Sequence, residues 1–224
     1  MTGIPASEFT HIGIGLYSLA EAARIMREPI TNVRRWASVN DTLVPRQLDA
    51  SEQTITFVEL IELHFIQMFR KEGISLHTIR RTSQIAAERH GTDYPFTVRR
   101  FDTDGTSIFS TLKSKTSRKF LLEDIARGQL VFEKIVRPFF RKLEYNRSKE
   151  LLRFWPMTKR RPIVIDPARK FGKPIDAETG IPTRTIANAL SAGGGQSPAD
   201  VARWLGVSLR AVRAAVDFEH SLAS

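Results

Sequence analysis

Three polar residues near the start of the chain have the types and spacing of side chains that contact DNA. Thr31, Asn32 and Arg35 follow Pro29 closely and point outward if this segment is a helix. An asparagine can bind adenine, and an arginine can bind guanine, through paired hydrogen bonds in the major groove. Either side chain can instead bind backbone phosphates, which positions a protein without selecting a sequence. We therefore expect these residues to contact nucleic acid.

A second group of this kind lies near the end of the chain. Ser208, Arg210 and Arg213 would face outward from a helix that follows the short turn Gly206–Val207. The sequence pattern of helix, turn and helix is typical of a helix-turn-helix. The same pattern also suits a small helical unit that binds protein and not DNA, and the neutral, apolar composition of the segment leaves both interpretations open.

The front group requires a pair of short helices to position it. Ser18 is a predicted N-cap, and Glu21 three residues later completes a capping box. Pro29 suits the first turn of a second helix. Apolar residues would form the seam between the two helices; they are Ala22, Ala23 and Val33. Short β-like pieces at 43–44 and 54–55 then suggest a small hairpin or wing.

Residues 57–155 show helical patterns first and then a mixture of strand-like and helical patterns. Residues 57–71 have a broad apolar helical face, and Ser75 and Gly91 are predicted to begin and end a second helix. The segments FTVRRF and SIFSTL flank Asp104 and Gly105, which predicts a β-hairpin. Residues 130–143 fit either a strand or a helix, and residues 151–155 predict a strand.

The rear of the chain predicts a strand at 163–167 and then three short helices, which begin near Thr185, Ser197 and Ser208. The predicted fold class is mainly α with a small β component (α+β). It comprises a winged helix-turn-helix over residues 1–91, a basic α+β segment over 92–158 and a bundle of short helices over 159–224.

Positive charge is concentrated in the middle of the chain. The net charge is +10 over 224 residues, and our count gives +11 for residues 111–170 and close to zero on either side. A basic balance of this size indicates a polyanionic partner, either nucleic acid or an acidic protein. A solvated charged face is a third interpretation, and the sequence does not separate the three.

The residues that would support catalysis or cofactor binding do not occur in recognisable patterns. The chain has no cysteine, no phosphate-binding loop and five isolated histidines, none in a zinc-binding spacing. We therefore expect no enzymatic activity, no metal and no cofactor. It also has no secretory signal and no run of about 18 apolar residues, so we expect a cytoplasmic protein without a membrane span.

Residues 17–89 resemble the MerR-type winged helix-turn-helix. The resemblance is carried by Arg34-Arg35-Trp36 and by Gly73-Ile74-Ser75-Leu76, with Ile79 three residues later. It implies that Arg34 and Trp36 clamp phosphates and that Arg46 and Gln47 lie near the wing. The alternative for Trp36 is that its ring only packs beneath the helix pair.

Residues 162–224 resemble a small antitoxin domain of unknown-function type. The matching segments are Ile165–Pro167, Gly172–Ile175 and Thr179–Thr183, followed by Gln196–Val201. The chain departs from the usual pattern at Gly180, where that family has an arginine, and in lacking a glycine before Thr179.

A MerR-like front followed by this rear domain is similar to bacterial VapB-type antitoxins. The resemblance implies a PIN-like ribonuclease toxin as partner and operator DNA as a second ligand. A palindromic operator requires a two-fold protein, so we expect a homodimer. Two alternatives remain: a MerR-like transcriptional regulator with no toxin partner, and a protein-interaction inhibitor that does not bind DNA.

Overall fold

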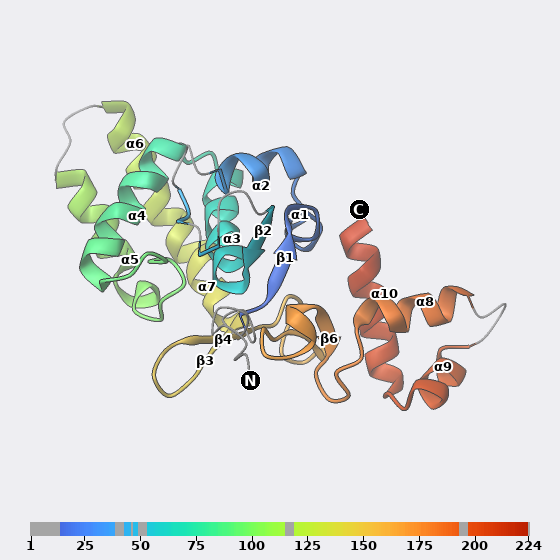
Figure 1. The fold of residues 1–224 in the computed structure, drawn as a ribbon. Helices are drawn as coiled ribbons and strands as arrows, with labels where there is room; N and C mark the ends of the chain where they lie inside the picture. The colour runs from blue at the N-terminus through green and yellow to red at the C-terminus, as the bar shows by residue number, and fades with distance from the viewer. Residues whose placement is uncertain are drawn as a thin grey trace, which may run out of the picture.

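Helices make up most of the chain, and two small antiparallel sheets lie between them (Figure 1). The computed structural model describes residues 14–38, 43–45, 47–48, 53–114, 119–192 and 197–223. Within these residues, no helix is both long enough and apolar enough to cross a membrane.

The front of the chain contains the expected pair of short helices. Strand β1 (Leu16–Ser18) leads directly into α1 (Leu19–Met26), and α2 (Ile30–Trp36) follows. Ser18 and Glu21 form the predicted capping box, with the Ser18 side chain accepting from the Glu21 N–H at 3.1 Å. The seam residues Ala22, Ala23 and Val33 are buried.

The strand that was expected to form a wing has a different partner. Strand β2 (Thr54–Thr56) pairs with β1, with Tyr17 opposite Ile55, and not with residues 43–44. Leu43 and Val44 form bends and bury their side chains in the core. Residues 39–42 and 49–52 lie outside the described residues, so the winged arrangement stays a prediction.

Helix α3 (Phe57–Lys71) lies at the centre of the main hydrophobic core, and α4 (Leu76–His90) packs beside it. The predicted boundaries of α4 are confirmed, because Ser75 caps its first turn and Gly91 ends it at φ 65°. The Phe65 ring of α3 contacts four other phenylalanine rings at centroid distances of 5.2–6.3 Å; these are Phe96, Phe101, Phe139 and Phe140.

The predicted β-hairpin around Gly105 is wrong. Residues 101–114 form α5 (Phe101–Ser114), which packs antiparallel to α6 (Lys119–Val131). A Cβ at Gly105 would lie 2.1 Å from the Phe132 ring, and a Cβ at Gly128 would lie 2.5 Å from the Phe109 ring. Both glycines therefore admit an aromatic ring of the neighbouring helical segment, and neither makes a turn.

The ambiguous residues 130–143 are helical. The chain continues from α6 through a π-helical turn, η2 (Phe132–Val136), into α7 (Arg137–Phe139) and a 3-10 turn, η3 (Phe140–Lys142). Strands β3 (Leu143–Tyr145) and β4 (Leu151–Phe154) follow, and β4 confirms the strand predicted at residues 151–155. The middle segment therefore contains both helices and strands, and helix α5 covers the residues where a hairpin was expected.

A four-stranded sheet connects the main core to the rear of the chain. Its antiparallel order is β3-β4-β5-β6, where β5 is Ile163–Ile165 and β6 is Pro174–Asp176. Between β5 and β6 lies a 3-10 turn, η4 (Lys170–Gly172). Ile165 belongs to the main core, whereas Ile163 belongs to a second, rear core. Strand β5 thus contributes to both.

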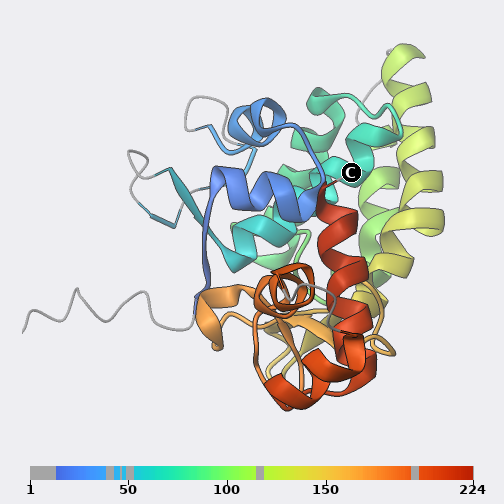
Figure 2. The ribbon, with the colours of Figure 1, turned by 90° about the vertical axis from the view of Figure 1, so that its right-hand side faces the viewer.

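The three predicted rear helices are present as α8 (Thr183–Ala192), α9 (Pro198–Leu205) and α10 (Leu209–Ala223). They surround the rear core of Ile186, Val201, Val212 and Phe218. The C-terminal end of α10 reaches α1, so that the last helix lies beside the first (Figures 1 and 2).

Candidate nucleic-acid interface

Helix α2 presents a basic outer face. Thr31, Arg34 and Arg35 are exposed, whereas Val33 and Trp36 on the opposite side are buried. Arg34 makes no hydrogen bond or ion pair with another residue in the part of the chain that the structure describes. Its guanidinium is therefore available to bind a phosphate or a base edge.

Asn32 is less available than its neighbours, because both polar atoms of its amide are occupied. Its Nδ2 donates to Glu28 Oε1 at 2.7 Å, and its Oδ1 accepts from Arg35 Nη2 at 3.3 Å. Glu28 also accepts from Gln67 of α3 at 2.8 Å. Contact between Asn32 and adenine would require these hydrogen bonds to exchange.

Trp36 is 2% exposed, and its indole N–H has no hydrogen-bond partner among the described residues. In this conformation the ring packs beneath the helix pair and does not reach a surface phosphate. The burial therefore favours the packing interpretation of Trp36 over the phosphate clamp.

Of the two residues expected near the wing, the structure describes Gln47. Arg46 lies outside the described residues. Gln47 is exposed, and its backbone N–H donates to Glu59 Oε1 at 2.9 Å. Because Glu59 is the N3 residue of the α3 capping box, Gln47 ties this loop to the start of α3.

The second group of predicted contact residues lies at the start of α10. The Ser208 side chain accepts from the Ala211 N–H at 3.1 Å, so it caps the helix. Arg210 and Arg213 are exposed and form no hydrogen bond or ion pair with another described residue. Val201, Val207 and Val212 are buried between α9 and α10, which confirms part of the predicted seam.

Sequence reasoning missed one exposed aromatic residue on this surface. Trp204, in the last turn of α9, is 73% exposed. Its neighbour Arg203 pairs with Asp200, and hydrogen bonds from Ser197 hold the pKa of that carboxyl below its usual value. A tryptophan in an amphipathic helix is usually expected in the core, so the sequence pattern alone could not show that Trp204 faces solvent.

The small antitoxin domain described above usually has an arginine at the position of Gly180. In this chain the guanidinium of Arg169 lies beside Gly180 instead. Gly180 has φ 75°, and a Cβ there would lie 2.8 Å from Arg169 Nη2. Arg169 Nη1 also donates to the Ala177 carbonyl at 2.8 Å. The guanidinium therefore occupies this turn, although its side chain starts eleven residues earlier.

The basic middle of the chain is partly neutralised by ion pairs. Arg153 donates to the buried Asp166 at 2.8 Å, and Arg161 pairs with Asp217 at 2.7 Å. Within the described residues, no group of three or more His, Asp or Glu side chains could hold a metal ion. The charged residues of this segment thus combine structural ion pairs with exposed cations.

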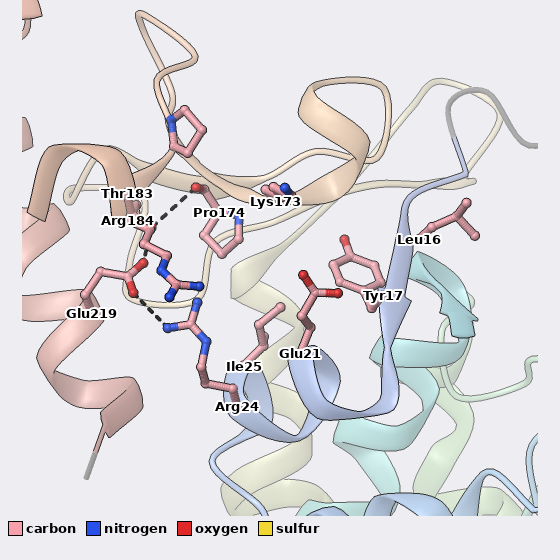
Figure 3. Close-up of a pocket in the computed structure, with 11 residues that line it drawn as sticks. Leu16, Tyr17, Glu21, Arg24, Ile25, Lys173, Pro174, Thr183, Arg184 and Glu219 are labelled. Carbon is pink, nitrogen blue, oxygen red and sulfur yellow. Dashed lines mark hydrogen bonds and ion pairs between the residues drawn. The ribbon is translucent and has the colours of Figure 1, made fainter. Parts of the chain in front are cut away.

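The two basic faces belong to helix pairs that contact each other through other surfaces. Arg24 of α1 donates to Glu219 of α10 at 2.8 Å (Figure 3). Nearby, Tyr17 of β1 donates to the Gly172 carbonyl at 2.8 Å. A cavity of about 90 Å³ lies between them. Because α1 and the end of α10 make this contact, the outer faces of α2 and of the first turns of α10 stay exposed.

Three comparisons relate the chain to known proteins. Residues 163–218 match a family described as "Protein of unknown function (DUF433)". Over 204 residues, 80% of this chain and 84% of the relative, the sequence is 23% identical to "Putative antitoxin VapB45" of Mycobacterium tuberculosis (strain ATCC 25618 / H37Rv). The crystal structure of Rv2018 from Mycobacterium tuberculosis matches with a TM-score of 0.75 at 20% identity, over 92% of this chain and 99% of that one. The last comparison shows a shared fold.

Proposed function

We propose that the chain is an antitoxin of a type II toxin–antitoxin system, which binds and neutralises a ribonuclease toxin of the PIN-like class and represses its own operon. The observation that carries the proposal is the similarity over 204 residues to a protein described as an antitoxin. The similarity extends over both cores and is not confined to the rear domain that matches the family of unknown function.

The proposed repressor activity uses the front helix pair. Arg34 and Arg35 on α2 have exposed guanidiniums that can reach DNA, and Thr31 lies on the same face. A homodimer would place two copies of α2 on the two halves of a palindromic operator. Arg210 and Arg213 on α10 are a second candidate for DNA contact, and equally a candidate for contact with the toxin.

The proposed toxin binding uses charge complementarity. Nucleases of the PIN-like class bind metal with clustered carboxylates, which gives the partner an acidic surface. The chain contributes a net charge of +10, of which a large share belongs to exposed cations of the middle segment. Opposite charges of this kind accelerate association and select the partner. No catalytic step by the chain itself is part of the proposal.

The test is to co-express the chain with the protein encoded beside it and to ask whether the two purify as one complex. The complex and the chain alone are then titrated against the promoter fragment of the operon. The proposal predicts a stable complex that shifts the fragment. A chain that shifts DNA without forming a complex would instead be a plain regulator, and a complex without any DNA shift would be a protein inhibitor.

The contribution of α2 is tested by Arg34→Gln with Arg35→Gln, which removes both exposed guanidiniums while keeping polar side chains. We expect promoter affinity to fall at least tenfold, since each side chain contributes a charge-assisted contact. Arg210→Gln with Arg213→Gln removes the same charge from α10 and is the matched variant. A loss only in the α10 variant would move the DNA contact to the rear helices.

A further inference from the structure

A third basic surface lies away from both helix pairs, where α5 begins and α7 and η3 end. Its cavity has a volume of about 680 Å³ and is lined by four cationic side chains around a single carboxylate. The cations are Arg99, Arg137, Arg141 and Lys159, and the carboxylate is Asp102. We call this cavity the basic cleft. Arg137 and Arg141 lie four residues apart in the helical segment of α7 and η3. Arg99 and Lys159 come from two other segments, so folding brings the three segments together.

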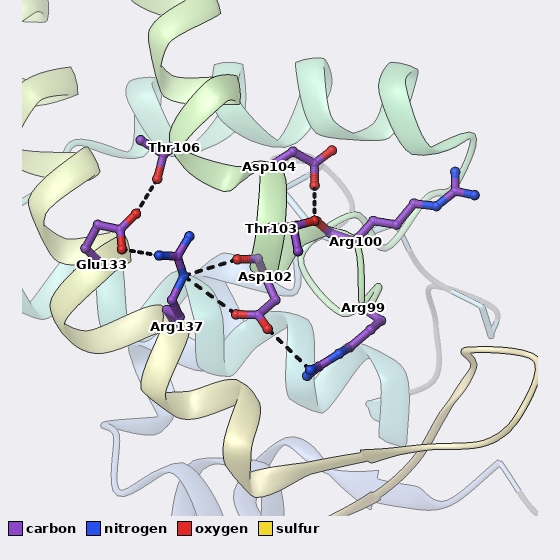
Figure 4. Close-up of polar contacts among 8 residues, drawn as sticks. All are labelled: Arg99, Arg100, Asp102, Thr103, Asp104, Thr106, Glu133 and Arg137. Atoms are coloured by element: carbon purple, nitrogen blue, oxygen red, sulfur yellow. Dashed lines mark hydrogen bonds and ion pairs between the residues drawn. The ribbon is translucent and has the colours of Figure 1, made fainter.

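Asp102 holds two of the cations in place. Arg99 Nη2 lies 3.5 Å from Asp102 Oδ2, and Arg137 Nε lies 3.9 Å from Oδ1 and 3.3 Å from the Asp102 carbonyl oxygen (Figure 4). Glu133 binds the other side of Arg137. The Arg99 guanidinium also lies over the Tyr145 ring, 5.7 Å from its centroid. These contacts orient Arg99 and Arg137 before any ligand arrives.

The other two cations, Arg141 and Lys159, have N–H groups that are available to a ligand. Arg141 and Lys159 are exposed, and neither makes a hydrogen bond or ion pair with another described residue. The lining therefore carries four positive charges against one negative charge. Such an excess over an open cavity attracts a multiply charged anion.

The apolar residues that line the basic cleft are buried and offer no surface on which a base could stack. Phe140 is 1% exposed and Leu143 is 3% exposed, so neither offers an open face to a ring. Nucleobases bind largely by stacking on exposed aromatic side chains. The lining therefore offers cations and no exposed aromatic face, which favours phosphate groups as ligands.

We propose that the basic cleft binds backbone phosphates of nucleic acid, at a site separate from α2 and α10. The four cations are spread around a wide cavity. Successive phosphodiesters along a strand can contact several of them at once, whereas one carboxylate of an acidic protein would contact fewer. Arg99 and Arg137 act as the pre-oriented pair, and Arg141 and Lys159 supply free donors. Phosphate contacts of this kind position a protein on nucleic acid without reading sequence. The site does not depend on an antitoxin function.

The test measures how the affinity for a random 20-base-pair DNA duplex depends on salt, in the Arg34→Gln, Arg35→Gln background so that α2 does not contribute. Each phosphate contact that is lost reduces the slope of log K against log [salt] by about 0.9. Arg141→Gln with Lys159→Gln should therefore reduce that slope by about 1.8. The matched control is Arg81→Gln with Lys113→Gln, which removes the same charge from exposed positions outside the basic cleft.

Competition with inorganic pyrophosphate separates two sources of phosphate. If millimolar pyrophosphate displaces the duplex, the basic cleft binds free phosphates as well as backbone phosphates. If the duplex stays bound, the basic cleft binds backbone phosphates alone. Equal slopes for the cleft and control variants, with unchanged melting temperatures, would overturn the proposal. So would binding of poly-glutamate that the cleft variant abolishes while its DNA binding stays intact, because the site would then accept acidic protein.

Discussion

Arg24 Nη1 donates a hydrogen bond of 2.8 Å to Glu219 Oε2, which joins the first helix of the chain to the last (Figure 3). The same carboxylate accepts a hydrogen bond from the Thr183 hydroxyl at the start of α8. The Glu219 side chain is 11% exposed, so water replaces these partners poorly. Glu219 therefore connects α1, α8 and α10 at a single, partly buried point.

Glu219→Ala should lower the free energy of unfolding by about 1–3 kcal/mol, because it leaves the Arg24 and Thr183 donors without their partner. Asp217→Ala is the matched control on the same helix, since Asp217 pairs with Arg161 where both side chains are about half exposed. An exposed pair contributes about 0–1 kcal/mol. Urea unfolding measures both, and equal losses would contradict a special role for Glu219.

Gly172→Ala should destabilise the junction between η4 and β1. Gly172 has φ 79°, which costs a residue with a side chain roughly 1–2 kcal/mol, and the new Cβ would lie 2.1 Å from Tyr17 Oη. We expect a loss of more than about 2 kcal/mol in thermal unfolding, since strain and clash add. Gly91→Ala tests the strain alone, because Gly91 has φ 65° with no atom within 4 Å of a new Cβ. Equal losses at both positions would exclude the clash with Tyr17.

Glu62→Gln should change how stability depends on pH. Burial raises the pKa of Glu62 to about 8, so the folded protein keeps this carboxyl neutral while the unfolded chain ionises it above about pH 4.5. Glu62 therefore stabilises the fold least at high pH: its contribution falls by about 1.4 kcal/mol per pH unit between those two values. The variant lacks this loss, and its stability relative to the natural protein should rise from pH 5 to pH 8.

The Glu62 experiment compares urea unfolding of the two proteins at each pH. The buried His64, whose pKa burial lowers to about 4, titrates in both proteins, so its contribution cancels in the difference. A difference in stability that stays constant from pH 5 to pH 8 would show that Glu62 is ionised in the folded state.

Asp124→Ala should remove the hydrogen bonds that join α6 to the start of α4. The Asp124 carboxylate accepts from the Ser75 hydroxyl at 2.6 Å, from the Ser75 N–H at 3.2 Å and from the Thr78 hydroxyl. Removing hydrogen bonds to a charged group costs about 1.5–3 kcal/mol. Glu123→Ala is the matched control, since its side chain is exposed beside Asp124. Hydrogen exchange should accelerate in the first turn of α4 in the Asp124 variant only.

Local features of the fold were predictable because the interactions that make them span a few residues. Ser18 and Glu21 lie three positions apart, so their capping box is visible in the sequence and present in the structure. Ser75 before α4 and Ser197 before α9 follow the same rule. The group of exposed residues on α2 was predictable for this reason too, since helical spacing alone separates them from Val33.

Features that depend on distant partners were not predictable from local pattern. Gly105 beside Asp104 has the composition of a turn, yet the Phe132 ring makes it a packing position inside a helix. Residues 54–56 have the composition of a strand, but their pairing with β1 and not with residues 43–44 depends on the placement of α1 and α2 between them. Trp36 and Trp204 are the same residue type, and tertiary contacts alone decide that one is buried and the other exposed.

The sequence by itself determined the capped starts of α1, α4 and α9, the rear strand and helices, and the excess of positive charge, since each depends on residue type or on neighbours within one turn of helix. The tertiary structure decided which charges meet. Arg99 and Lys159 line one cavity, and Arg24 pairs with Glu219. The packing of the two cores places these side chains together. Side chains so far apart in the chain have no local interaction that could reveal their contact, so the basic cleft emerges only on folding.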